Sequence, residues 1–323
     1  MTLISNYKSN DIKSSIWQFL PKNLSIPFFS VIQMRTEKRV PYFLVLPCIA
    51  VLIGIGLYPF LYGLWLSFYK WSIFKPAEGY TFIFLGNYFN FITDQHALTT
   101  VINTLTFTAG AVTFEFILGF GIALLVNSIK RGSDLITTAL ILPMAMTPIL
   151  VGLIWKMLLD PTLGWIPYIF SLVGIKLPPL LASHQTALAT VIFVDIWQWT
   201  PFMTLLLYAG LRSLPIEPFE AAQLDGASRR HTLQYIIIPG LMPIIAIALA
   251  FRVIDSLNFF DVMFIMTGGG PGTSTESINY YAYKTGFSWG NMSYATSIAI
   301  VMLYVLVLIS QVLFRIAKPQ RRE

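Results

Sequence analysis

The sequence predicts an all-α membrane protein that crosses the bilayer six times, and three observations support this prediction. Of its 323 residues, 56% are hydrophobic and only 11% are charged, whereas soluble domains carry about 25% charged residues. Two stretches, 40–69 and 285–314, contain no Asp, Glu, Lys, Arg or His, and each exceeds the roughly 20 residues that cross a bilayer as a helix. Both stretches lack the alternation of a membrane barrel, so their backbone groups must bond within helices.

The apolar segments follow a polar and basic amino-terminal region. Pro21, Lys22 and Pro27 interrupt the apolar patch in residues 1–39, which is therefore too broken for a signal peptide or a membrane span. Residues 1–39 are predicted to form a cytoplasmic tail. A six-helix transmembrane domain is expected over 40–316, and a second cytoplasmic tail over 317–323. The predicted spans lie near 40–68, 98–128, 135–157, 185–211, 236–265 and 292–316.

Lysine and arginine residues predict the orientation of these spans. Besides the two tails, they concentrate in two loops, at Lys130, Arg131, Arg212, Arg229 and Arg230. The alternate loops hold only Lys70, Lys75, Lys176 and Lys284. Because positively charged loops stay on the cytoplasmic side, we expect both termini inside. Topology and lipid head groups therefore explain the net charge of +6 better than nucleic-acid binding does.

The loop at about 213–239, between the fourth and fifth spans, is predicted to form a short helix, a sharp turn and a second helix. Pro215 and Pro218 suit the first turn of a helix, and the negative charge of Glu220 complements the positive amino-terminal end of the helix dipole. Gly226 favours the end of that helix, and Ser228 can cap the next one. Any polytopic protein could cap an inner loop in this way, so composition alone leaves its role open.

The same loop resembles the EAA signature of binding-protein-dependent ABC importer permeases, which reads E-A-A, three residues, Gly, nine residues and I-x-L-P. The matching residues are Glu220, Ala221, Ala222, Gly226, Ile236 and Pro239, while Ile238 replaces the leucine. Further stretches resemble the carbohydrate-type branch, which includes the maltose and glycerol-3-phosphate permeases. They are Ser67-Phe68, Asn103-Thr104, 197–201 (WQWTP) and 259–275 (FFDVMFIMTGGGPGTST).

The resemblance implies a type I ABC importer permease in the inner membrane of a prokaryote. Its short helix would be the coupling helix that docks on a separate ATPase, through Glu220, Ala221, Ala222, Asp225 and Gly226. The implied partners are two ATP-binding subunits, a second homologous permease and an extracytoplasmic solute-binding protein. No G-x-x-x-x-G-K-[ST] loop occurs in the sequence, so ATP and Mg would be bound by the partner subunits. The chain is therefore expected to be a transporter subunit with no cofactor, rather than an enzyme.

The glycine-rich segment after the fifth span has two interpretations. Gly268, Gly269, Gly270 and Pro271 are candidates for contact with a docked binding protein, and a plain surface turn is the alternative.

Ionisable residues within the predicted spans are costly in hydrocarbon, so they usually face a cavity or a partner. They are Glu115, Asp195, Arg252, Asp255 and Asp261. Arg252 and Asp255 are three residues apart and can pair on one helix face. His96, His184 and His231 show no metal-ligand spacing, and Cys48 is the sole cysteine, which excludes an intrachain disulfide.

A sugar requires hydrogen-bonding side chains and flat apolar faces along a wet cavity. Residues of this chemistry within or beside the spans are Asn258, Phe259, Trp197, Trp199, Asp255, Asn291 and Ser297. The resemblance favours Asn258, because the family's substrate contacts lie on this helix. Helix packing is the alternative role for the aromatic members of this set. Within the spans, Arg252 alone could attract a phosphorylated ligand, which favours a neutral sugar.

Two other classes of membrane protein would require different residues. A secondary transporter driven by an ion gradient would need a titratable relay within the membrane and no ATPase. A membrane-embedded enzyme would need clustered histidines or paired acids at one depth, which the sequence does not indicate.

Overall fold

The computed structural model describes residues 40–129 and 132–317. The tails predicted at 1–39 and 317–323 lie outside the described residues, except for Ala317. The described chain divides into two compact units between Phe60 and Leu61. Among the described residues, the only sheet is a two-stranded antiparallel hairpin, in which Tyr69 pairs with Phe82. The described chain is otherwise helical, as the composition predicts.

The helices and strands follow one another along the chain as follows: α3 (Val40–Val51), η2 (Leu52–Leu57), α4 (Tyr58–Leu66), β1 (Tyr69–Lys70), η3 (Pro76–Glu78), β2 (Thr81–Phe82), α5 (Gly86–Thr93), α6 (Gln95–Ser128), α7 (Ser133–Ala145), α8 (Pro148–Leu158), α9 (Trp165–Leu172), α10 (Ala187–Ser213), α11 (Glu217–Leu224), α12 (Arg229–Thr232), η4 (Leu233–Ile237), α13 (Ile238–Leu257), α14 (Asp261–Met266), α15 (Ile278–Tyr283), η5 (Lys284–Ser288) and α16 (Met292–Ala317). The segment η3 is a 3₁₀-helix, whereas η2, η4 and η5 are π-helical.

Five helices in the described residues are long and apolar enough to cross a membrane, at Val45–Leu66, Gln95–Ser128, Ala187–Ser213, Arg229–Leu257 and Met292–Leu313. A sixth span is obtained if α7 and α8 are counted together, although they are bent by 92°. The break has a local cause. Thr147 precedes Pro148 and is extended, with ψ of 142°, because the proline ring excludes the helical conformation for the residue before it.

The fifth predicted span, 236–265, differs from the structure at both ends. The helix begins at Arg229 and ends at Leu257, and a separate helix α14 starts at Asp261. Asn258 donates from its side-chain amide to the Ile254 carbonyl, 2.9 Å away. Such local side-chain bonds to the backbone compete with helix continuation, and the chain therefore turns where hydropathy alone predicts a continuous span.

Close packing of α6 against α10 organises the second unit. A Cβ atom built on Gly119 of α6 would lie 2.6 Å from the Cβ of Met203 on α10, so only glycine allows this approach. Small residues at helix crossings are typical of membrane bundles, because apolar lipid gives helices little hydrophobic reason to associate. Two apolar clusters flank the crossing, one containing Phe107, Ala111, Val191, Val194 and Met263 and the other Ala123, Leu207, Leu211, Leu241 and Ile245.

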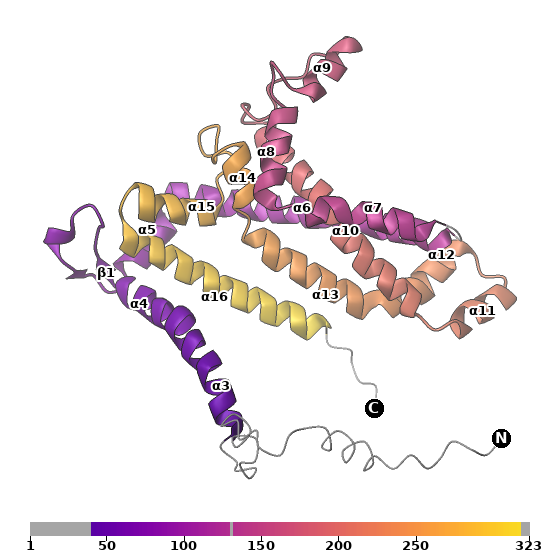
Figure 1. Cartoon of the computed structure of the whole chain (residues 1–323), viewed down its shortest axis with the longest axis horizontal. Coiled ribbons are helices and arrows are strands. Elements are labelled where there is room, and N and C mark those ends of the chain that lie inside the picture. Colours follow the sequence, from indigo (N-terminus) through magenta and orange to yellow (C-terminus); the bar gives the residue numbers. More distant parts are fainter. Residues whose placement is uncertain (1–39, 130–131, 318–323) are drawn as a thin grey trace, which may run out of the picture. The chain divides into compact units, whose positions relative to one another are not determined.

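Within the second unit, α13 runs beside α16, and α11 and α12 lie at one end of the bundle. The helices α5 and α15 lie at the opposite end (Figure 1). The two loop regions singled out by the sequence, 213–239 and 268–271, are therefore far apart along the bundle.

Candidate functional site

A buried ion cluster lies where α6, α10 and α13 meet. Arg252 of α13 binds Glu115 of α6 through Nε to Oε2 at 2.6 Å and Nη2 to Oε1 at 2.7 Å. The same Nη2 donates to Asp195 of α10 at 2.7 Å, and Nη1 donates to Asp255. The pairing predicted between Arg252 and Asp255 is confirmed, and it is part of a larger cluster.

The guanidinium of Arg252 is almost saturated by these contacts. Four of its five N–H groups donate to carboxylates. Its carbon also lies 4.9 Å from the ring centroid of Trp199, at a distance typical of a cation–π contact. Arg252 and Glu115 are 2% and 0% exposed. Burial of these charges is tolerable only because they are paired and hydrogen-bonded.

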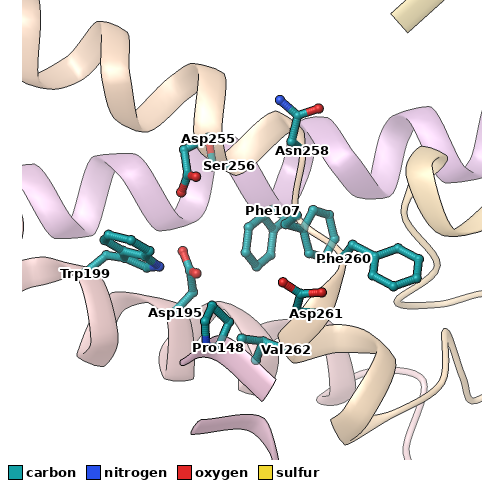
Figure 2. A pocket seen from close by; sticks show the side chains of 11 residues that line it. Phe107, Pro148, Asp195, Trp199, Asp255, Ser256, Asn258, Phe260, Asp261 and Val262 are labelled. Atoms are coloured by element: carbon teal, nitrogen blue, oxygen red, sulfur yellow. The ribbon is translucent and has the colours of Figure 1, made fainter. Parts of the chain in front are cut away.

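A cavity of about 110 Å³ adjoins the cluster. We call it the acidic cavity, and its lining consists of Phe107, Pro148, Asp195, Trp199, Asp255, Ser256, Asn258, Phe259, Phe260, Asp261 and Val262. Figure 2 shows the carboxylates of Asp195 and Asp255 directed toward one another across it. Asp255 and Asp261 are exposed, and within the described residues the Asp261 side chain has no hydrogen bond or ion pair. The cavity thus offers carboxylates beside aromatic faces.

The structure brings four of the predicted pathway residues to this cavity, namely Asn258, Phe259, Trp199 and Asp255. Phe259 stacks on Phe107, with ring centroids 3.7 Å apart. The Asn258 side chain is directed away from that of Asp255 in Figure 2.

The other three predicted pathway residues lie elsewhere. Trp197 contacts Trp155, with ring centroids 5.5 Å apart. Asn291 lines a different cavity, together with Lys70 and Trp71. Ser297 is buried and donates to the Tyr294 carbonyl at 2.7 Å. The sequence therefore grouped residues that the fold separates.

The loop at 213–239 forms the predicted helix, turn and helix. Gly226 ends α11 with φ of +68°, a conformation that favours glycine. Ser228 caps α12 by accepting from the His231 backbone N–H. We call residues 217–232 the elbow. Glu220, Ala221, Asp225 and Gly226 are exposed and Ala222 is half-buried, so the predicted coupling residues share one surface-accessible segment.

Apolar side chains on and beside the elbow lack cover from the described chain. Leu224 is 89% exposed and Ile216 is 65% exposed. Lipid explains exposed apolar residues along the spans, but the elbow connects two spans at the end of the bundle. Exposed apolar side chains grouped in a polar loop are typical of protein contact sites.

The glycine-rich loop is held in place by α6. Asn103 donates from Nδ2 to the carbonyl of Thr273 at 2.7 Å and to that of Glu276 at 3.2 Å. Thr104 accepts from the Ile278 backbone N–H at 3.0 Å. Gly268 and Gly269 have φ of +58° and +85°. The Asn103-Thr104 pair singled out in the sequence therefore fixes the loop that contains Gly268, Gly269, Gly270 and Pro271.

A second polar cluster at this loop was not anticipated. Glu276 is fully buried and accepts from His96 Nε2 at 3.0 Å and from Lys284 Nζ at 3.2 Å. His96 and Glu276 are 180 positions apart, so no local pattern signals their contact.

Asp94 connects the same region to α15 and α16. Its carboxylate accepts from Tyr281, and from Tyr294 at 2.9 Å. Partial burial raises the pKa of Asp94, but hydrogen bonds from the two tyrosines and from the backbone N–H groups of His96 and Ala97 outweigh it and lower the pKa. Burial and the bond to Asp94 raise the pKa of Tyr281, which stays protonated as a donor.

The bundle, the elbow and the cavity define a helical membrane permease. The profile of the family described as "Binding-protein-dependent transport system inner membrane component" matches residues 115–323, and the chain belongs to this family. It is 31% identical over 272 residues to the trehalose/maltose transport system permease protein MalF of Thermococcus litoralis, which covers 84% of this chain and 91% of the relative. It is 32% identical over 280 residues to the trehalose transport system permease protein SugA of Mycobacterium tuberculosis, covering 87% and 89%.

A solved structure shares the fold. It is a bacterial alginate ABC transporter in complex with alginate pentasaccharide-bound periplasmic protein. The TM-score is 0.74 with 22% identity, over 86% of this chain and 94% of that chain. The predicted all-α, polytopic, permease-like fold is thus confirmed.

Proposed function

We propose that this chain is the membrane-spanning subunit of an ATP-driven importer for a sugar or sugar-like solute. Family membership supports the importer class, and similarity to the trehalose/maltose and trehalose permeases supports the sugar class. The aromatic rings and hydrogen-bonding side chains of the acidic cavity suit an uncharged polyol.

The elbow is the observation that carries the proposal. It is rigidly capped at Gly226 and Ser228, and it exposes Leu224 without cover from the described chain. Docking of α11 in a cleft of an ATP-binding subunit would bury Leu224 and leave Glu220 free to accept charge-assisted hydrogen bonds. Two such subunits would bind ATP and Mg, and their closure would push the spans from inward-open to outward-open.

The acidic cavity supports the need for a second permease subunit. Its volume of about 110 Å³ is below the roughly 300–1,000 Å³ typical of ligand sites. A homologous subunit facing this surface would enlarge and close it.

The solute-binding protein would dock at the end of the bundle opposite the elbow. A cavity of about 380 Å³ lies there, lined in part by Lys156, Asp160, Gly270 and Pro271. Anchoring of the adjoining loop by Asn103 keeps this surface fixed for docking. In this arrangement the elbow and both termini are cytoplasmic, as the lysine and arginine distribution indicates.

A secondary transporter is the second candidate. The buried Glu115, Asp195 and Arg252, together with the exposed Asp255, favour it, because titratable groups inside a bundle are typical of proton relays. Arg252, however, engages all three carboxylates, as expected of a structural clamp. The elbow and the family support the ATP-driven class.

The test is co-purification of the ATP-binding subunits with Glu220→Lys and Leu224→Asp variants. We expect both variants to insert normally, to lose the ATP-binding subunits and to lose ATP-dependent uptake in vesicles. Lys176→Asp, an exposed change elsewhere, is the matched control and should retain both. Normal retention of the subunits and normal uptake by both elbow variants would refute the docking role.

A further inference from the structure

We propose that the acidic cavity discriminates by charge, admitting neutral and cationic carbohydrates and rejecting anionic ones such as sugar phosphates and uronic acids. The inference rests on the proposed function, because it assumes that solute passes this cavity. It assigns the discrimination to Asp255 and Asp261.

The charged residues that line the acidic cavity are all acidic. Asp195, Asp255 and Asp261 line the cavity, and among the described residues no Lys, Arg or His does so. Asp261 has no hydrogen-bonding or ionic partner in the described chain, and the side chain of Asp255 is 57% exposed. Both carboxylates can accept hydrogen bonds from sugar hydroxyls or from an ammonium group.

The nearby cation, Arg252, is not available to a ligand. Arg252 would be the natural partner for a phosphate or carboxylate, but it is only 2% exposed. Four of its N–H groups already donate to Glu115, Asp195 and Asp255, and Trp199 covers its guanidinium. An anion in the cavity would therefore meet carboxylates without a free donor.

Acidic groups outnumber basic groups around the cluster. One guanidinium is shared by three carboxylates, and Asp261 lies nearby without a basic partner in the described residues. A cleft lined by charge of one sign between apolar walls focuses the electric field, so that excess negative charge repels an anion and attracts a cation. A neutral sugar does not experience this repulsion, and its hydroxyl groups can donate hydrogen bonds to the carboxylates.

The local potential can be measured without knowing the substrate. The complete transporter, with Cys48→Ser and Asn258→Cys, is reacted with a cationic and an anionic methanethiosulfonate reagent of similar size. Use of the complete complex includes the charges of the partner subunits. The measured quantity is the ratio of the rate constants of the cationic and the anionic reagent. We expect this ratio to be at least tenfold higher at Asn258→Cys than for a thiol in solution. Adding Asp255→Asn and Asp261→Asn should return the ratio to within about threefold of the solution value.

Two comparisons complete the experiment. Asp160→Asn, which removes an aspartate of another cavity, should leave the ratio high. Equal rates for the two reagents at Asn258→Cys would overturn the inference. Failure of both reagents to react, in the nucleotide-free and in the ATP-bound complex, would also overturn it, because the cavity would then be closed to solutes. The elbow variants test the importer role separately, so an ATP-dependent importer with a flat reagent ratio would reject only the charge selection.

Discussion

Arg252 and Glu115, 137 positions apart in the sequence, form a two-pronged ion pair between α13 and α6, with donor–acceptor distances of 2.6 and 2.7 Å. The planar guanidinium donates to both carboxylate oxygens of Glu115. This bidentate geometry fixes the axial offset of the two helices as well as their contact. Asp195 adds α10 to the same clamp. One side chain thus joins three candidate spans.

Loss of this clamp should destabilise the protein strongly. Arg252→Met leaves the buried carboxylates of Glu115 and Asp195 without their cation, and removal of one partner from a buried ion pair costs about 3–5 kcal/mol. We expect a clear fall in the thermal unfolding midpoint of the purified protein. The double variant Arg252→Met with Glu115→Gln should recover part of the loss, because one buried charge is removed. An unchanged midpoint in the single variant would show that the clamp is not structural.

The crossing of α6 and α10 can be tested with two glycines on one helix. Gly119→Ala would place a methyl group 2.6 Å from the Cβ of Met203, and overpacking of this kind costs about 1–3 kcal/mol. Gly121→Ala meets no atom within 4 Å and should be neutral or stabilising by up to about 1 kcal/mol. Thermal unfolding of both variants gives the comparison. Equal effects of the two changes would contradict the close helix contact.

Asn103 should control the order of the glycine-rich loop. Asn103→Ala removes the donor that holds the carbonyls of Thr273 and Glu276. We expect amide hydrogen exchange at residues 268–277 to accelerate at least tenfold, because the anchored loop opens more often. Thr99→Ala, an exposed change one turn earlier on α6, is the control and should leave exchange in the loop unaltered. Slow exchange in the Asn103 variant would mean that other contacts hold the loop.

The Asp94 contact makes a pH-dependent prediction. Its pKa in the folded protein is lowered from the ordinary value of 3.8, so its contribution to stability is complete above that value and is lost as pH falls through the folded pKa. Tyr281→Phe removes one donor and should cost about 1 kcal/mol, a figure reduced for partial exposure.

The midpoint difference between Tyr281→Phe and the parent should therefore be constant from pH 7 to pH 5 and should shrink below about pH 3.8. Tyr304→Phe, a change at an exposed tyrosine of α16, should show no such difference. A gap that widens on acidification would contradict the assigned protonation of Asp94.

Local signals in the sequence predicted local structure well. The elbow was predicted because Gly226 and Ser228 act on their own neighbours, and the pairing of Arg252 with Asp255 was predicted because they are three residues apart on one helix. The end of α13 was predicted too late, because mean hydropathy does not register the side-chain bond from Asn258 to Ile254.

Contacts between distant segments were not predicted. Glu115 and Asp195 were recognised as ionisable residues within the spans, but their meeting at Arg252 depends on how α6, α10 and α13 pack. The sequence showed only that His96 lacks metal-ligand spacing, and it did not indicate that His96 binds the buried Glu276. Trp197 and Trp199 are two residues apart, and on a helix this spacing directs side chains to different faces. Only Trp199 therefore reaches the acidic cavity, whereas Trp197 contacts Trp155.

The energy source for uptake is the most direct test of the proposed role. The complete transporter, purified with its partner subunits, is reconstituted in liposomes with the solute-binding protein and a radiolabelled sugar that this protein binds. Uptake is measured with ATP alone and with a proton or sodium gradient alone. We predict uptake against a concentration gradient with ATP, none with either ion gradient, and none with ATP when Glu220→Lys is present. Uphill uptake driven by an ion gradient without ATP, unaffected by Glu220→Lys, would contradict the account.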